Sequence, residues 1–403
     1  MGRSTKHIYP MLCLIVILTG VLAVFYFNPA ILHSLPWLSS DPNETFPPSS
    51  QLPDDDGEVD EPPVDEPPVG EPPVDEPPVD QPTEPETIVT LTGYYYTYDD
   101  MKKDLAGLAA RYPDTMSYHS YGISADGRDL YVATLGNLDA PKQVIITAGM
   151  HAREYVNPFV VMQQLEYYLA HYDTVRYDGH MLRDLFTEVC FVIVPMANPD
   201  GITLAQEGID AIRSEEIRQT VRDICSDMST KTLNDYLNMY WKSNALGVDI
   251  NRNFDALWNE HYDGVGRPSV KNYKGTAAMS EVETTHLVAL TESLSNPVAS
   301  VCLHSQGEII YWRCFQEGAL EVKNERLAKI AARVTGYGII DENQSEPSYS
   351  NWTILAYGIP TITVETGLMG YPQNHGTMAS GIYDCTRDLW AAVAVAYAGL
   401  AKG

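Results

Sequence analysis

The sequence predicts an α/β domain with a mixed, mostly parallel central sheet and helices on both faces, preceded by a membrane helix and a Pro-rich linker. Two observations favour the domain: short β-branched apolar runs recur from Thr87 onward, and segments of helical spacing alternate with them. Such alternation is typical of a parallel sheet covered on both sides. A third observation is that an uncharged apolar segment and a run of paired prolines come before it.

Residues 1–28 are expected to form a cytoplasmic tip and a transmembrane anchor. Residues 8–27 contain no charged side chain, and twenty apolar residues suffice to cross ~30 Å of hydrocarbon as a helix. Arg3 and Lys6 precede this segment, which predicts a single-pass protein with its N-terminus in the cytoplasm and the domain after the linker outside the cell. A cleaved signal peptide is the alternative, but no clear small-x-small cleavage site follows the apolar segment.

Residues 29–86 read as a disordered Pro/Glu-rich linker. Four five-residue units with paired prolines begin at Glu61, Glu66, Glu71 and Glu76. Paired prolines favour extended polyproline II, and the repeated carboxylates repel one another, so the segment should act as a stiff spacer. A tolerated low-complexity linker without a spacing role is the alternative. The segment is too polar and Pro-rich to fold over the domain that follows it, so we expect that domain to be synthesised in a functional form.

The charge of the chain excludes one class of partner. The formal net charge is −28, and residues 41–86 carry 16 acidic residues without a single Lys or Arg. Non-specific nucleic-acid binding requires Lys and Arg to neutralise phosphates, so no nucleic-acid partner is expected. The six Cys show no metal-like spacing, and they leave the disulfide state open. The oligomeric state is also left open.

Residues 87–403 are expected to form the α/β domain. Strands are predicted over residues 130–135, 143–148, 188–195, 298–303 and 361–365, and helices over residues 98–112, 157–171, 280–294, 319–335 and 385–400. In open sheets of this kind, ligands bind at the carboxyl ends of the parallel strands.

Polar side chains follow several of these strands where they end. His151 and Glu154 come after the strand 143–148, His304 ends the strand 298–303, and Glu365 ends the strand 361–365. Each residue alone has an ordinary structural alternative, such as a hydrogen-bonded histidine or a salt-bridged glutamate. Together they favour a metal site, because Zn²⁺ accepts both ligand types and a catalytic site needs only three protein ligands.

From about Tyr94 to the C-terminus, the chain resembles zinc metallocarboxypeptidases of the carboxypeptidase A type. The motifs that carry the resemblance occur in family order; they are His151-x-x-Glu154, Asn198-Pro199-Asp200-Gly201, the segment from Gly247 to Phe254, Leu303-His304-Ser305 and the segment from Thr363 to Gly367. The resemblance implies one Zn²⁺ held by His151, Glu154 and His304, with Glu365 as the general base. It also implies that Asp249 orients a ligand imidazole.

The same resemblance implies the residues that bind substrate. Asn251 and Arg252 match the pair that holds a free substrate carboxylate, and Arg153 matches a further basic residue of the site. Lys242 stands where the carboxypeptidase A pattern has the Arg that steadies the oxyanion. Tyr349 is the candidate for the mobile tyrosine that faces the substrate, which would bring Ser350 and Asn351 near the specificity pocket.

The form of the segment from Trp241 to Phe254 looks more like bacterial members that cut cell-wall peptides. We therefore expect a membrane-anchored, extracellular zinc peptidase that hydrolyses the γ-D-Glu–diamino acid bond of peptidoglycan stem peptides. A general metallocarboxypeptidase acting on ordinary peptides is the alternative. A catalytically inactive binding protein is disfavoured because the three proposed metal ligands and Glu365 are all present. A non-peptide amide hydrolase is disfavoured by the retention of Asn251 and Arg252.

Overall fold

The computed structural model describes residues 86–137, 139–226, 232–368, 370 and 375–400. The predicted membrane helix, and all of the predicted linker except Glu86, lie outside the described residues, so the structure does not test them. Among the residues that are described, no helix combines the length and the apolar character that crossing a membrane requires.

The described part of the chain contains an eight-stranded mixed sheet in the order β1-β2-β6-β3-β7-β10-β8-β9. The four central strands, β6, β3, β7 and β10, run parallel, while β1, β2 and β8 join by antiparallel pairing. The mixed, mostly parallel sheet is therefore confirmed. The strand bounds are β1 Met116–Ile123, β2 Asp129–Leu135, β3 Lys142–Thr147, β6 Val189–Val194, β7 Pro297–His304, β8 Ile309–Tyr311, β9 Gly338–Ile340 and β10 Thr361–Glu365, with a separate hairpin of β4 Arg176–Tyr177 and β5 His180–Met181.

Helices connect these strands. Their bounds are α2 Tyr98–Arg111, α3 Val156–Ala170, α4 Leu182–Glu188, α5 Pro199–Glu207, α6 Glu215–Ile224, α7 Leu233–Tyr240, α8 Val282–Ser293, α9 Gly318–Thr335, α10 Tyr349–Tyr357, α11 His375–Thr386 and α12 Leu389–Ala398, with short 3₁₀ turns η2 Ile209–Ala211 and η3 Ile250–Arg252. The first helix begins with a reciprocal capping box, because Thr97 and Asp100 bond each other's backbone N–H. One predicted helix, residues 385–400, is divided in the structure between α11 and α12.

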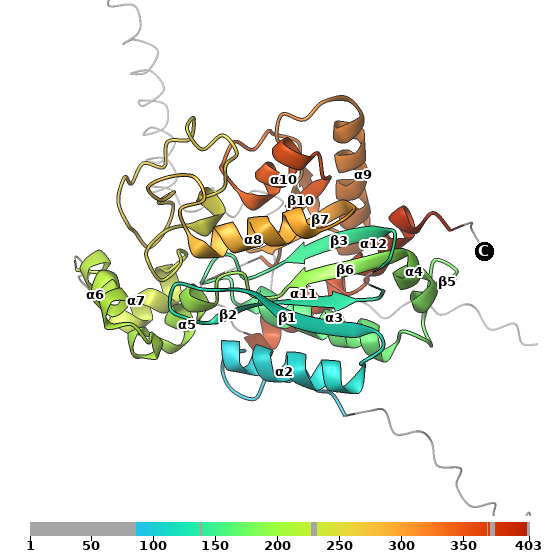
Figure 1. The fold of residues 1–403 in the computed structure, drawn as a ribbon, viewed down its shortest axis with the longest axis horizontal. Helices are drawn as coiled ribbons and strands as arrows, with labels where there is room; N and C mark the ends of the chain where they lie inside the picture. The colour runs from blue at the N-terminus through green and yellow to red at the C-terminus, as the bar shows by residue number, and fades with distance from the viewer. Residues whose placement is uncertain (1–85, 138, 227–231, 369, 371–374, 401–403) are drawn as a thin grey trace, which may run out of the picture. The chain divides into compact units, whose positions relative to one another are not determined.

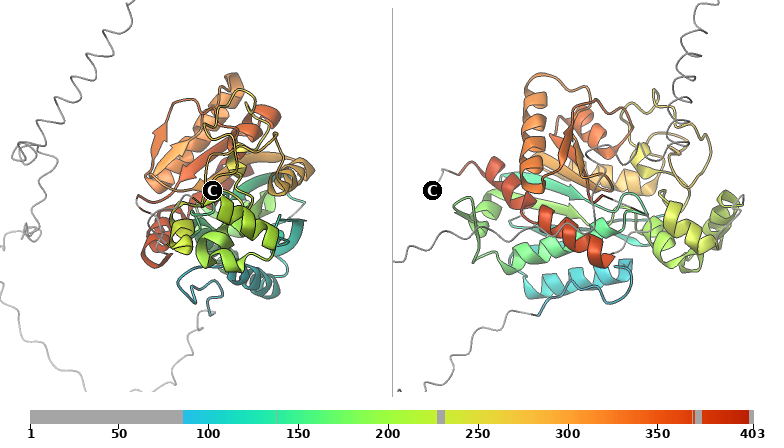
Figure 2. Two further views of the ribbon diagram at one scale, coloured as in Figure 1. Left: turned by 90° about the vertical axis from the view of Figure 1, so that its left-hand side faces the viewer. Right: turned by 180° about the vertical axis from the view of Figure 1, so that it is seen from behind.

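Two buried apolar clusters lie on opposite faces of the sheet. Alternate residues of one strand join different clusters: Val192 belongs to the smaller cluster, and Phe191 and Ile193 belong to the larger one. The larger cluster joins the sheet to α2, α3, α9 and α12, and the smaller one joins it to α8 and α10. Figure 1 shows α8 in front of the sheet, and the view from behind in Figure 2 shows the red C-terminal helices on the other side. Helices thus cover both faces, as predicted.

Cysteine side chains take part in this core. Cys190 and Cys302 lie in central strands and are completely buried, as their apolar surroundings in the sequence predict. All five cysteines within the described residues are free thiols, so the described domain has no disulfide.

Candidate metal centre and active site

The loop between β3 and α3 presents the first two candidate ligands. Gly149, two residues after the end of β3, has φ = +64°, and a Cβ there would lie 2.9 Å from atoms of Pro158 and Ile202. A glycine is therefore required both by the backbone conformation and by the close packing. Asn198 steadies the loop, because its Nδ2 donates to the carbonyl oxygen of Met150 at 3.1 Å.

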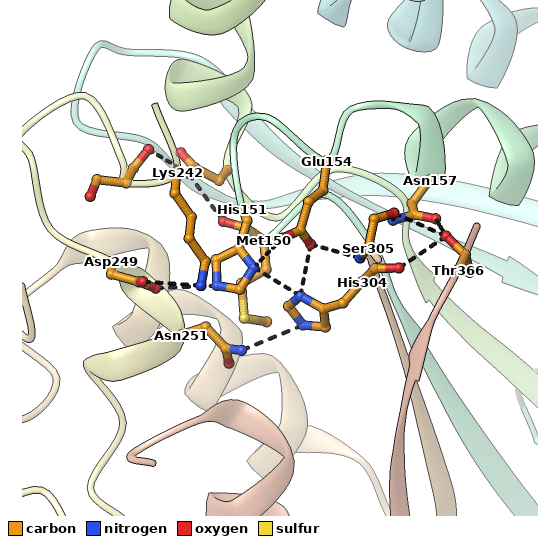
Figure 3. Close-up of polar contacts among 12 residues, drawn as sticks. Met150, His151, Glu154, Asn157, Lys242, Asp249, Asn251, His304, Ser305 and Thr366 are labelled. Carbon is orange, nitrogen blue, oxygen red and sulfur yellow. Dashed lines mark hydrogen bonds and ion pairs between the residues drawn. The ribbon is translucent and has the colours of Figure 1, made fainter. Parts of the chain in front are cut away.

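Three side chains converge at the carboxyl ends of β3 and β7 (Figure 3). His151 Nδ1 lies 2.8 Å from Glu154 Oε1, and His304 Nδ1 lies 3.0 Å from Glu154 Oε2. The two imidazole Nδ1 atoms are themselves 3.0 Å apart. All three side chains are at most 4% exposed. Two nitrogen donors and one carboxylate thus point at a common position within a buried pocket.

The charge states of these groups suit a metal ligand set. Burial lowers the pKa of His151 below its ordinary value, which favours the neutral imidazole with a free lone pair. Burial alone would raise the pKa of Glu154, but His151 and His304 outweigh that effect and keep the carboxyl well below its usual range. Neutral imidazole and ionised carboxylate are the forms that bind Zn²⁺.

The donor set matches one of the known catalytic zinc arrangements. Ligand atoms of His151, Glu154 and His304 all lie within 4.8 Å of one another. Two His and one Glu form the three-ligand set of zinc hydrolases, which leaves a fourth position for water or substrate. The three residues therefore fit Zn²⁺ as a bound cofactor.

Asp249 lies on the far side of the His151 ring. Its Oδ1 is 3.2 Å from His151 Nε2, although the two groups are not aligned as a hydrogen bond and neither atom has another partner among the described residues. Its Oδ2 accepts from the backbone N–H of Asn272 at 3.2 Å. Burial alone would raise its pKa, but Lys242 and His151 hold the pKa of this carboxyl well below its ordinary value. Asp249 is thus an ionised, buried partner for the ligand imidazole.

Glu365 ends β10, directly beside His304 in the parallel register of β7 and β10. Its carboxyl lines the same cleft as His151 and Glu154. Burial and the nearby charge of Glu154 raise its pKa from the ordinary value to about 7. Such a carboxyl can exchange a proton near neutral pH, which is what general acid–base chemistry requires.

The cleft has a volume of about 220 Å³ and carries several basic residues. The candidate substrate-binding residues Arg153, Asn251 and Arg252 all line it. Arg252 donates from Nη1 to the carbonyl oxygen of Asn251 at 2.9 Å, and Asn251 Oδ1 accepts from the backbone N–H of Tyr349 at 3.1 Å. These bonds fix the two side chains at the wall of the cleft.

Lys242 also lines the cleft, and its Nζ lies 3.6 Å from Asp249 Oδ2. The carbonyl oxygen of Lys242 accepts a hydrogen bond from the N–H of Ala152 at 3.1 Å. This bond connects the segment after α7 to the loop between β3 and α3, which carries His151 and Glu154. The lysine is thus close to the proposed metal centre and is paired with the carboxylate that supports it.

Tyr349 does not lie where the sequence interpretation placed it. Its side chain is completely buried, and its hydroxyl is 2.9 Å from Thr291 Oγ1. Its ring packs against Phe254 and Trp352, with centroids 5.4 and 5.9 Å away. A tyrosine held in this aromatic cluster cannot face a substrate, so we correct its assignment to a core residue.

Three residues of the cleft had no signal in the sequence. Tyr311 and Arg313 come from β8 and the segment after it, and Glu346 precedes α10. The strand β8 has only three residues, which is too short for an alternation of apolar and polar residues to be recognised. Glu346 lies in an irregular segment. Ser350 and Asn351, expected near a specificity pocket, do line the cleft.

Comparisons with known proteins agree with this geometry. The model of the zinc carboxypeptidase family matches residues 101–377. The chain is 28% identical over 274 residues to gamma-D-glutamyl-L-diamino acid endopeptidase 1 of Lysinibacillus sphaericus, covering 68% of this chain and 65% of that protein. It is 26% identical over 243 residues to human mast cell carboxypeptidase A, covering 59% of this chain and 52% of that protein. The chain thus spans less than two thirds of either relative.

A solved structure supports the fold. The crystal structure of thrombin activatable fibrinolysis inhibitor matches with a TM-score of 0.61 and 18% sequence identity, covering 78% of each chain. The family match and the His–Glu–His group together confirm the prediction of Zn²⁺ as the cofactor. The chain belongs to the zinc carboxypeptidase family of metallopeptidases.

Proposed function

We propose that this protein is a zinc peptidase that hydrolyses an amide bond next to a residue with a free carboxylate. The observation that carries the proposal is the convergence of His151, Glu154 and His304 at the cleft that Glu365 lines from the strand next to His304. A ligand set without a neighbouring base would suit a structural metal. The carboxyl of Glu365, with its raised pKa, makes hydrolysis the better interpretation.

In this proposal the side chains have separate roles. His151, Glu154 and His304 would hold Zn²⁺, which supplies Lewis-acid chemistry and makes water a stronger nucleophile near neutral pH. Glu365 takes a proton from the attacking water and delivers it to the leaving amine. Asp249 holds the His151 ring in place through its contact at Nε2, as supporting carboxylates do for ligand histidines.

The polar and basic residues that line the cleft orient the substrate. Arg252 and Asn251 bind the free carboxylate of the residue beside the scissile bond, and Arg153 adds a second positive charge. The planar guanidinium of Arg252 can make two parallel hydrogen bonds with a carboxylate, which fixes orientation as well as charge. Lys242 stands close enough to the metal centre to stabilise negative charge on the reacting carbonyl oxygen.

We further infer that the natural substrate is a peptidoglycan stem peptide cut between γ-D-glutamate and the diamino acid. Support comes from the name of the Lysinibacillus relative and from the form of the segment from Trp241 to Phe254. The apolar segment 8–27 and the Pro-rich residues 29–86 suit an anchor and a spacer that hold the domain outside the cell membrane, within reach of a cell wall.

The test uses the purified full-length protein with Zn²⁺ and mass spectrometry of L-Ala-γ-D-Glu-diaminopimelate. An ordinary peptide with a free C-terminus and a chelator-treated sample run in parallel. We expect zinc-dependent release of diaminopimelate with the ordinary peptide left intact. Trimming of the ordinary peptide alone would replace this proposal with a general carboxypeptidase. Cleavage of neither would favour the inactive binding protein.

A further inference from the structure

One acidic residue of the cleft has no part in the proposed chemistry. Glu154 and Glu365 are used as metal ligand and base, but Glu346 also lines the cleft and is only partly exposed. It lies in the segment that leads from β9 into α10, close to the residues that follow β8. An acidic side chain at the wall of a substrate cleft can bind a positively charged group of the substrate.

The backbone around Glu346 is held firmly. Its carbonyl oxygen accepts from the N–H of Ser348 at 2.7 Å and from Nδ2 of Asn351 at 2.8 Å. The N–H of Gln344 donates to the carbonyl oxygen of Arg313 at 2.8 Å, which ties the segment to the exit of β8. The position of the Glu346 side chain is therefore set by the fold and not by a free loop.

The carboxylate of Glu346, in contrast, is not engaged in an ion pair with any of the described residues. In the described part of the chain, Glu346 forms no ion pair, and its Oε2 accepts one hydrogen bond, from the N–H of Ser345 at 3.2 Å. Arg313, another basic residue of the cleft, is paired with Glu321 at 2.7 Å. Burial, together with the negative charges of Glu365, Glu346 and Glu342, raises the pKa of Tyr311, which lines the same cleft. Glu346 thus adds a negative charge without an ion-pair partner to the part of the cleft lined by Tyr311.

The cleft wall next to Glu346 carries several hydroxyl groups. Thr363 Oγ1 donates to Ser350 Oγ at 3.2 Å, and Ser350 Oγ lies 3.1 Å from Ser348 Oγ, and all three residues line the cleft. A hydroxyl surface does not favour an apolar side chain, because hydroxyls covered by an apolar group lose their contact with water. It accommodates a polar chain that ends in a charged group.

We propose that Glu346 binds the side-chain ammonium group of the substrate residue whose α-carboxylate is held at Arg252, and so selects a diamino acid at that position. This inference rests on the proposed function. A substrate that fills the cleft removes water from Glu346, and a carboxylate that loses water without gaining a cation is strongly unfavourable. An ammonium partner removes that penalty, and a neutral side chain of the same length does not.

The test compares two substrates that differ only in the ammonium group: L-Ala-γ-D-Glu-L-Lys and its L-norleucine counterpart. Steady-state kinetics are measured on zinc-loaded full-length wild-type protein, on Glu346→Gln and on Glu342→Gln. The last is the matched control, because Glu342 is exposed in the same segment and does not line the cleft. Calorimetric binding of free L-lysine and L-norleucine to the same proteins gives a second readout that needs no hydrolysis.

We expect the wild type to prefer the lysine substrate in kcat/KM, and Glu346→Gln to lose roughly 10- to 100-fold on that substrate alone, the range for a hydrogen bond to a charged group. Glu342→Gln should behave as the wild type. Equal turnover of both substrates by the wild type, or an equal loss on both in Glu346→Gln, would overturn the role of Glu346 while the peptidase proposal stands. If neither substrate is cut, the peptidase proposal fails, and L-lysine binding then tests the ammonium site alone. Weaker L-lysine binding by Glu346→Gln supports that site, and unchanged binding contradicts it.

Discussion

Asp249 contacts the side of the His151 ring that faces away from the proposed metal. Asp249 Oδ1 lies 3.2 Å from His151 Nε2, while Nδ1 of the same ring faces Glu154. The contact assigns the two ring nitrogens to different tasks. Nδ1 is directed into the metal centre, and Nε2 is directed towards an ionised, buried carboxylate (Figure 3). A carboxylate in this place fixes the ring orientation and raises the basicity of the ligand nitrogen.

Replacing Asp249 with Asn is therefore expected to weaken zinc binding by about 10- to 100-fold. Asn preserves the size of the side chain but removes the charge that supports His151. Competition with a chromophoric chelator measures the zinc dissociation constant. Asp255→Asn is the control, because Asp255 is exposed and lies nearby in the sequence. An unchanged dissociation constant for Asp249→Asn would show that the contact has no effect on the metal.

Glu365→Gln separates chemistry from metal binding. Gln has nearly the same shape but cannot take a proton from water, so kcat should fall at least ~100-fold. Bound zinc, measured by elemental analysis, should stay at one ion per chain, because Glu365 is not among the three candidate ligands. The exposed Glu317→Gln variant is the control and should retain full activity. Activity near the wild-type level in Glu365→Gln would remove Glu365 from the mechanism.

The strands that carry the site could be recognised from sequence because they are buried on both faces. The predictions for β3, β6, β7 and β10 differ from the structure by at most one residue at each end. Their continuous apolar runs leave few alternatives, and the polar residues at their ends stand out. The positions of His151, His304 and Glu365 followed from those ends.

Edge strands and irregular segments gave no such signal. Only the first residue of β1 is buried and its burial does not alternate regularly, and β8 and β9 have three residues each. Tyr349 was misassigned because a tyrosine after an irregular segment looks the same in sequence whether it faces the core or the cleft. Only the helix α10, whose first residue is Tyr349, determines that its ring points towards Phe254.

Glu283 gives the domain a pH dependence that can be isolated by mutation. This side chain is 1% exposed, and burial together with the charge of Asp200 raises its pKa to about 7. The folded state then holds a proton that the unfolded state releases at lower pH, so stability falls as pH rises from about 4.5 to 7. Glu283→Gln cannot ionise and lacks this loss.

Urea unfolding of both proteins at pH 5 and pH 8 tests the effect. Titration of all other groups largely cancels in the difference between the two proteins. From pH 5 to pH 8 the wild type should lose on the order of 3 kcal/mol of unfolding free energy relative to Glu283→Gln. Parallel pH dependence of the two proteins would contradict a raised pKa at this position.

Lys242 is positioned for two different tasks, and its mutants can distinguish them. Its Nζ lies 3.6 Å from Asp249 Oδ2, and the side chain also lines the cleft beside the metal ligands. If the lysine stabilises charge on the reacting carbonyl oxygen, Lys242→Met should lower kcat by about 100- to 1,000-fold with little change in KM. If it serves only to support Asp249, the same variant should instead bind zinc more weakly.

We expect the loss in kcat, because Lys242 lines the cleft, whereas Asp249 is completely buried and does not line it. Lys242→Arg keeps the positive charge and should recover part of the activity, which a purely steric role would not allow. The exposed Lys103→Met variant on α2 serves as the control. A wild-type kcat in Lys242→Met, combined with weaker zinc binding, would assign Lys242 to the support of Asp249 and leave the carbonyl oxygen to be stabilised by another group of the cleft.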